Sequence, residues 1–336
     1  MVARSRLILV LVAGLASLAV TGCKAAAPAR DPQAHPGQLV RLADGRRLNL
    51  RCSGKGGPTV LLESGFAATS LAWWKVQPKI AKTHRVCSYD RAGYGFSDEG
   101  PAPRDGAATA RDLDHALRVA KIRGPFILVG HSAGGLYVRL FADRQPRDVV
   151  GMVLVDTSVE FQEQRFAAAF GAGAGSLEGI RQRAVRCLEA AERKALPSDD
   201  PALVRCTPKP RDGEAAEAAD ARMAEAVNPA NWRTQISELD SLWTTTSRAV
   251  AAGRGAYGDM PLIVLTAGDA YGDAPEPGRA MVRAFWTGLH REVAARSTRG
   301  AQRSVANASH MMMFDQPDAV VEAVAEVSAM SKAGRP

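Results

Sequence analysis

Short runs of uninterrupted apolar residues recur along the chain and alternate with segments that have helical periodicity. Continuous apolar runs of this length are typical of strands buried on both faces of a parallel sheet. We interpret six such runs as strands: 58–64, 84–90, 125–130, 149–156, 261–268 and 303–309. Amphipathic helical patterns occupy 70–82, 107–121, 134–144, 279–296 and 318–330. This alternation predicts an α/β protein with a mostly parallel central sheet flanked by helices.

Two regions depart from this alternation. Residues 38–54 contain two short alternating runs on either side of Asp44-Gly45, a pattern that predicts a β-hairpin. Residues 157–259 contain no convincing strand pattern; they are alanine-rich, charged and helical in periodicity. We interpret them as a helical insertion over the carboxyl ends of the strands. The expected core is therefore 39–157 with 259–334, and the expected cap insertion is 158–258.

The first 22 residues have the pattern of a secretory signal peptide. Arg4 and Arg6 precede an uncharged run at 7–20, which is shorter than the roughly 20 residues of a membrane span. The residues that follow, Val20-Thr21-Gly22-Cys23, resemble a bacterial lipobox, whose cysteine is lipidated. We expect a lipoprotein anchored through Cys23 on the periplasmic or cell-surface side of a membrane, with 23–38 as a flexible tether.

Composition and charge narrow the function classes. The chain has 336 residues, of which 46% are hydrophobic and 23% charged, as in ordinary globular proteins. Loss of the leader would lower the formal net charge from +8 to +6, and the remaining basic residues are scattered, so we expect no nucleic-acid partner. Four cysteines follow Cys23; they lack zinc-site spacing, and export permits disulfides with three possible connectivities.

The motif Gly130-His131-Ser132-Ala133-Gly134 lies where a strand pattern becomes a helix pattern. Together with the hairpin, the parallel strands and the helical insertion, it resembles the α/β-hydrolase fold over residues 38–333. Two further segments carry the resemblance: "YDRAGYGFSD" at 89–98 and "SHMMMFDQPDAV" at 309–320. They are similar to esterase, lipase and aminopeptidase-like members that have a GHS-x-GG motif and a helical cap.

The resemblance implies a Ser-His-Asp triad. Ser132 is the nucleophile on a sharp strand-to-helix turn, and His310, in a loop after the last predicted strand, is the base. We expect the other histidines to be inactive; His131 adjoins Ser132, and neighbouring residues on a turn project apart. For the acid, Asp269 follows a strand end and is the first candidate. Asp156 and Asp273 are the alternatives.

The expected oxyanion donors are the backbone N–H groups of Phe66 and Ala133. Many members of the family have His-Gly after the third strand, whereas this chain has Glu63-Ser64-Gly65-Phe66. Backbone donors tolerate that departure, and we expect Glu63 to be a structural, hydrogen-bonded carboxylate. Asp90 and Arg91 are interpreted as shaping the turn after the fourth strand rather than as catalytic.

The resemblance also selects a disulfide pairing. Cys52 on the second hairpin strand and Cys87 on the fourth strand occupy neighbouring strands of an α/β-hydrolase sheet. Cys187 and Cys206 both fall within the insertion. The expected disulfides are therefore Cys52–Cys87 and Cys187–Cys206.

The expected activity is hydrolysis of a small-molecule carboxylic ester through an acyl-enzyme, without a metal or organic cofactor. A serine nucleophile argues against the haloalkane dehalogenases and epoxide hydrolases of this fold, which use an aspartate at that position. One alternative is amide or peptide cleavage, as in the proline-iminopeptidase-like branch. Another is a non-catalytic binding protein on the same fold.

Overall fold

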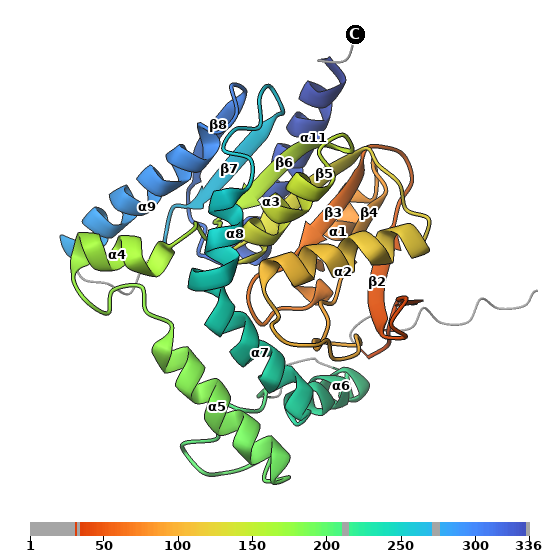
Figure 1. Cartoon of the computed structure of the whole chain (residues 1–336), viewed down its shortest axis with the longest axis vertical. Coiled ribbons are helices and arrows are strands. Elements are labelled where there is room, and N and C mark those ends of the chain that lie inside the picture. Colours follow the sequence, from red (N-terminus) through yellow and green to blue (C-terminus); the bar gives the residue numbers. More distant parts are fainter. Residues whose placement is uncertain (1–30, 32–33, 210–214, 271–275, 334–336) are drawn as a thin grey trace, which may run out of the picture. The chain divides into compact units, whose positions relative to one another are not determined.

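An eight-stranded, mostly parallel sheet forms the centre of the molecule (Figure 1). The computed structural model describes residues 31, 34–209, 215–270 and 276–333. Strand β2 is antiparallel to β1 and β4, and all the other neighbouring strands are parallel. The order across the sheet is β1 (Gln38–Arg41), β2 (Arg47–Ser53), β4 (Val86–Tyr89), β3 (Thr59–Glu63), β5 (Phe126–His131), β6 (Val149–Val155), β7 (Leu262–Ala267) and β8 (Gly300–Val305).

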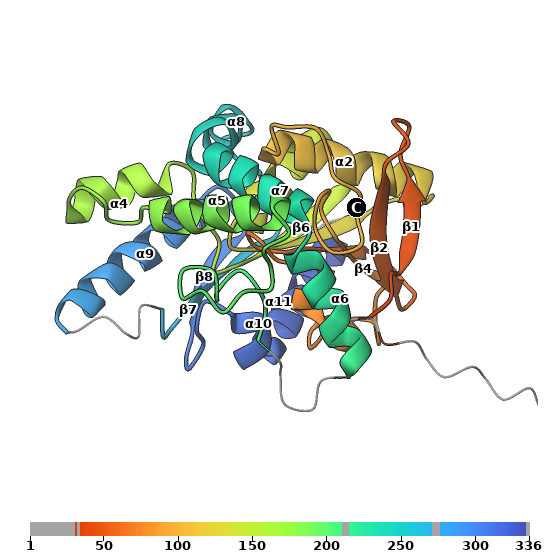
Figure 2. The ribbon, with the colours of Figure 1, turned by 90° about the horizontal axis from the view of Figure 1, so that it is seen from below.

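Helices cover both faces of the sheet. Helices α2 and α3 pack against each other on one face, and α1 and α11 lie on the other (Figures 1 and 2). The core elements are η1 (Ser70–Trp73), α1 (Gln77–Ile80), α2 (Gly106–Val119), α3 (Gly134–Arg144), α9 (Gly278–Ala294), α10 (Met312–Asp315) and α11 (Pro317–Ala333). Every residue of β3, β4, β5 and β7 is buried, as the continuous apolar runs predicted.

Two predicted elements differ from the structure. The helix expected at 70–82 is split into η1 and the one-turn α1, with Pro78 in the first turn of α1. The last strand, expected at 303–309, begins at Gly300 and ends at Val305. Beyond Val305 the backbone leaves the extended conformation: Asn307 has a φ of 56°, and the carbonyl of Ala308 accepts a hydrogen bond from the backbone N–H of Asp269.

A helical cap is inserted between β6 and β7, as predicted. It contains α4 (Gln162–Phe170), α5 (Glu178–Glu192), α6 (Ala216–Ala226), α7 (Pro229–Ser241), the π-helical η2 (Leu242–Thr246) and α8 (Ser247–Ala252). Helices α5 to α7 extend beyond the sheet at the lower end of Figure 1. Within the cap, Trp232 packs with Ala184 and Ala191 around Cys187 and Cys206, forming a small second core.

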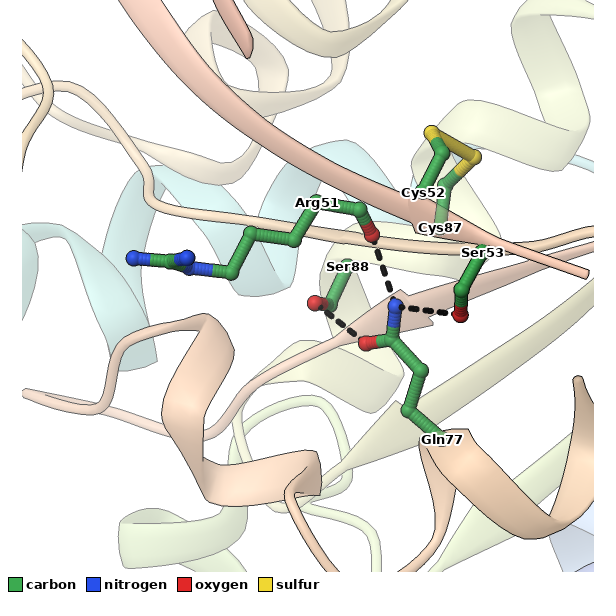
Figure 3. Close-up of a disulfide and its surroundings, with 6 residues drawn as sticks. All are labelled: Arg51, Cys52, Ser53, Gln77, Cys87 and Ser88. Atoms are coloured by element: carbon green, nitrogen blue, oxygen red, sulfur yellow. Dashed lines mark hydrogen bonds between the residues drawn. A yellow bond between two sulfur atoms is a disulfide. The ribbon is translucent and has the colours of Figure 1, made fainter. Parts of the chain in front are cut away.

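Both expected disulfides are present. Cys52 and Cys87 are directly opposed on the antiparallel strands β2 and β4, and Cys187 is bonded to Cys206 in the cap. Figure 3 shows that Gln77 crosses the same strand pair beside the first disulfide. Its Nε2 donates to the carbonyl of Arg51 at 2.7 Å, and its Oε1 accepts from the Ser88 hydroxyl at 2.7 Å. Strands β2 and β4 are therefore joined both by a disulfide and by the side chain of Gln77.

The expected leader at 1–22 and the lipidation residue Cys23 lie outside the described residues. Within the part of the chain that the structure describes, no helix combines the length and the apolar character needed to cross a membrane.

Candidate active site

Ser132 occupies a sharp turn between β5 and α3. Its backbone φ is +51°, in the left-handed region, and its N–H donates to the carbonyl of Val155 at 3.1 Å. A Cβ at Gly130 would lie 2.7 Å from the carbonyl oxygen of Gly134. A Cβ at Gly134 would lie 2.6 Å from the carbonyl oxygens of Glu63 and Ser64. The glycines are required because three segments approach one another closely: the strand, the turn and the loop 63–66 that contains the expected donor Phe66, which we call the oxyanion loop.

Of the candidate acids among the described residues, Asp156 is the one that is hydrogen-bonded to His310. The Nδ1 of His310 lies 2.6 Å from Oδ2 of Asp156, whose side chain is only 2% exposed. Asp156 follows β6, whereas Asp269 follows β7. Asp269 is exposed and forms an ion pair with Arg283 at 3.3 Å. The structure therefore places Asp156, the alternative candidate, behind the histidine; Asp273 lies outside the described residues.

The second oxygen of Asp156 is also held. Its Oδ1 accepts hydrogen bonds from the backbone N–H of Ala267 at 3.0 Å and from Nε1 of Trp286 at 2.9 Å. Burial by itself would raise the pKa of Asp156, but the hydrogen bond and charge of His310 outweigh it and lower that pKa below its usual value. A fixed, ionised carboxylate at this position can orient an imidazole and stabilise its protonated form.

The two residues expected to supply the oxyanion donors lie at the same cavity as Ser132. Phe66 and Ala133 both line it. Among the described residues, neither N–H donates to another protein group. Unused donors beside a serine at the N-terminus of α3 are suited to hold a developing oxyanion.

His131 projects toward the loop that carries His310. Its Nε2 lies 2.8 Å from the backbone carbonyl of His310, and the two ring centroids are 4.7 Å apart. A Cβ at Gly65 would lie 2.8 Å from Nδ1 of His131. Burial, followed by repulsion from His310, lowers the pKa of His131 to about 3. The ring is therefore neutral, and its Nε2–H donates to the loop that carries the base.

A cavity of about 790 Å³ joins these groups. Core residues line one side of it. The cap side is lined by four apolar residues: Leu177 just before α5, Ile180 in α5, and Leu242 and Trp243 in η2. Phe66 and Trp286 add aromatic surface, so most of the lining is apolar. Within the described segments, no cluster of His, Cys, Asp and Glu side chains could hold a metal ion.

Most of the chain matches a known protein family. Residues 60–323, which are more than half of the chain, match the alpha/beta hydrolase family. The chain belongs to the alpha/beta hydrolase family. The cavity of this alpha/beta hydrolase lies between its core and its cap.

Three similar proteins place this alpha/beta hydrolase among its relatives. It is 39% identical to the "Probable transporter efuK" of Hormonema carpetanum over 127 residues, which cover 35% of this chain and 18% of that protein. It is 37% identical to the 2-hydroxymuconate semialdehyde hydrolase of Pseudomonas sp. (strain CF600) over 123 residues, 35% of this chain and 42% of that enzyme. The chain thus spans less than half of these curated relatives. The epoxide hydrolase CorEH has the same fold, with a TM-score of 0.62, 16% identity and coverage of 87% and 98% of the two chains.

Sequence reasoning gave too little weight to two residues of this alpha/beta hydrolase site. Asp156 and Asp269 both follow ends of neighbouring strands, so position alone could not separate them. His131 was assigned no role, because the direction of its side chain depends on the backbone of the turn at Ser132. His290, another of the histidines expected to be inactive, is fully buried; its ring nitrogens lie 2.6 Å from the Thr266 hydroxyl and 2.9 Å from the carbonyl of Thr157.

Proposed function

We propose that this alpha/beta hydrolase is a serine hydrolase that cleaves carboxylic esters through Ser132, His310 and Asp156. The observation that carries the proposal is the 2.6 Å hydrogen bond between Asp156 and His310, in a cavity that His310 shares with Ser132. Because Nδ1 of His310 is bound to Asp156, the other ring nitrogen, Nε2, is left to serve as the base.

The reaction proceeds in two halves. Ser132 Oγ attacks the ester carbonyl while Nε2 of His310 takes its proton, and the N–H groups of Phe66 and Ala133 hold the oxyanion. Collapse breaks the bond to the alcohol, which leaves with the proton from His310. Water then attacks the acyl-enzyme with His310 again as base, which releases the carboxylic acid and restores Ser132.

The cavity lining favours substrates with a bulky apolar part. Phe66, Trp243 and Trp286 are aromatic, and Leu177 and Ile180 are aliphatic. Burial of such a group contributes roughly 25 cal/mol per Å² of apolar surface. We therefore expect esters with medium aliphatic or aromatic groups to be cleaved with higher kcat/KM than acetate esters.

A fluorophosphonate probe tests the proposal directly. It phosphonylates an activated serine, so wild-type protein should be labelled and Ser132→Ala should not. A panel of p-nitrophenyl esters and aminoacyl anilides then separates ester from amide cleavage. No labelling of folded wild-type protein would refute the serine mechanism and favour a non-catalytic binding protein, and faster anilide turnover would refute ester preference.

We also propose that the enzyme acts after export, anchored by a lipid on Cys23. The two disulfides support this, because such bonds persist in oxidising compartments. Mass spectrometry of protein expressed with its leader should find cleavage before Cys23 and a diacylglyceryl adduct on it. Cys23→Ser should abolish both the adduct and membrane association. An unmodified Cys23 in the membrane fraction would contradict the anchor.

A further inference from the structure

A buried charged cluster that the proposed reaction does not use lies between the core and the cap. Arg91 is paired with Glu63 at 2.9 Å and with Glu238 at 3.1 Å, and all three side chains are 3% exposed. Glu63 ends β3, whereas Glu238 lies in helix α7 of the cap. The cluster thus joins segments that are far apart in the sequence.

Arg91 also holds the oxyanion loop. Its Nη1 donates to the carbonyl of Ser64 at 2.8 Å, and its Nη2 donates to the carbonyl of Gly65 at 2.8 Å. These carbonyls immediately precede Phe66, whose N–H is one of the two proposed oxyanion donors. The planar guanidinium therefore fixes two successive peptide groups, and the second of them contains the N–H of Phe66 together with the carbonyl of Gly65.

Glu238, on the cap, is held equally tightly by two tyrosines of the core. Its Oε1 accepts from the Tyr137 hydroxyl at 2.6 Å, and its Oε2 accepts from Tyr94. The turn that carries Arg91 is in close contact with α7: a Cβ at Gly93 would lie 1.9 Å from Oγ1 of Thr234. The segment 89–98, which the sequence suggested was a purely structural turn, is thus the part of the core that receives the cap.

We propose that Arg91 and Glu238 are positioning residues that couple the seating of cap helix α7 to the geometry of the oxyanion loop. If α7 moved away, Arg91 would lose one of its two carboxylates inside a buried site. Arg91 would keep Glu63 as a counter-ion, but its Nη2 and the hydroxyls of Tyr94 and Tyr137 would lose the acceptor that they share. Buried donors without an acceptor are costly. The guanidinium would then shift toward water or toward Glu63, and either shift releases the carbonyls of Ser64 and Gly65. The oxyanion donors would thus be aligned only when the cap is closed on the core.

This inference rests on the proposed serine hydrolase function, and the experiment separates the two. Glu238→Gln keeps the shape of the side chain and removes its charge, and Arg91→Lys keeps the charge and removes the planar fork. The matched control is Glu160→Gln, which disrupts a second buried pair, Arg139–Glu160 at 2.8 Å, that makes no contact with the oxyanion loop among the described residues.

The readouts are kcat and KM for a p-nitrophenyl ester and the inhibition constant of a trifluoromethyl ketone, which forms a tetrahedral adduct with the serine. Loss of a full oxyanion donor costs about 10²–10³ in kcat, so misalignment should cost roughly 10- to 100-fold. For Glu238→Gln and Arg91→Lys we expect that loss in kcat, a parallel weakening of the ketone and a KM within about threefold of wild type. Glu160→Gln should lower the melting temperature but keep kcat within about twofold of wild type.

Folded Glu238→Gln and Arg91→Lys variants with wild-type kcat and ketone affinity would overturn the coupling, as would an equal kcat loss in Glu160→Gln. If neither variant folds, Tyr137→Phe decides, because it removes only one hydrogen bond to Glu238. It should lower kcat and ketone affinity by about fivefold, from roughly 1 kcal/mol of lost hydrogen bonding; unchanged values would overturn the coupling. Failure of wild-type protein to react with fluorophosphonate would instead refute the serine mechanism itself.

Discussion

Replacement of Asp156 by asparagine is the sharpest test of the proposed triad. Asparagine keeps an Oδ1 that can accept from Ala267 and Trp286, so the local fold should survive. Its Nδ2, however, is a donor placed where the carboxylate oxygen lies 2.6 Å from Nδ1 of His310. That donor requires a bare Nδ1 and therefore puts the proton on Nε2, the nitrogen that must accept the proton of Ser132.

The expected loss of kcat follows from the tautomer of His310. An imidazole locked in the wrong tautomer lowers kcat by about 10⁴, which corresponds to about 5 kcal/mol of transition-state stabilisation. Asp269→Asn is the matched control, since Asp269 is 55% exposed and contacts Arg283 at 3.3 Å. Exposed pairs of this kind contribute about 0–1 kcal/mol to stability, and we expect kcat to stay within about twofold of wild type.

Both variants are assayed with the same p-nitrophenyl ester and by the rate of fluorophosphonate labelling, with thermal unfolding as the check on folding. The expected order is wild type similar to Asp269→Asn, with Asp156→Asn about 10⁴-fold slower in both assays. A folded Asp156→Asn variant within tenfold of wild type, or an Asp269→Asn variant that loses as much, would refute the assignment.

Three further predictions concern groups around the site. Burial raises the pKa of Glu63 from its usual 4.5 to about 7 in the folded state. The protonated carboxyl therefore stabilises the fold fully below pH 4.5, and that stabilisation is lost as the pH rises through 7. Urea unfolding should therefore show that wild type loses about 3 kcal/mol relative to Glu63→Gln over this range; a pH-independent difference would refute the shift. His131→Phe keeps a ring but loses the hydrogen bond to the carbonyl of His310, so kcat should fall about fivefold. His131→Gln keeps a donor and should retain most of the activity. Equal kcat values for the two variants would exclude a role for the donor. Replacing Cys52 and Cys87 by alanine opens a loop of 35 residues and should lower the unfolding free energy by about 4 kcal/mol, with no change expected in labelling of Ser132; unchanged stability would contradict a disulfide in the purified protein.

The sequence was most informative where local pattern and global fold agree. Uninterrupted apolar runs located the buried strands, and the glycines around Ser132 located the turn, because close packing there permits no side chain. The position of His310 and the two disulfides followed from the resemblance to a known sheet. The deciding property was thus a periodicity for the strands, a glycine pattern for the turn, and a strand order supplied by the resemblance for the disulfides.

Long-range geometry accounts for what could not be predicted. Asp156 and Asp269 end adjacent parallel strands, and the choice between them depends on the fold-back of Asp269 toward Arg283 and on Trp286 supporting Asp156. Glu238 carries no sequence signal, because it meets Arg91 only when the cap has folded onto the core. No periodicity or motif spacing encodes such a contact.

Ser132, the proposed nucleophile, has a left-handed backbone conformation that lowers the stability of the fold. A non-glycine residue at φ of +51° costs roughly 1 kcal/mol, which glycine at the same position would avoid. A change from Ser132 to glycine would therefore be tolerated by the fold, while the chain would lose its proposed nucleophile. Under the proposed function, a folded, disulfide-bonded relative of this sequence with glycine at this turn would be an inactive one.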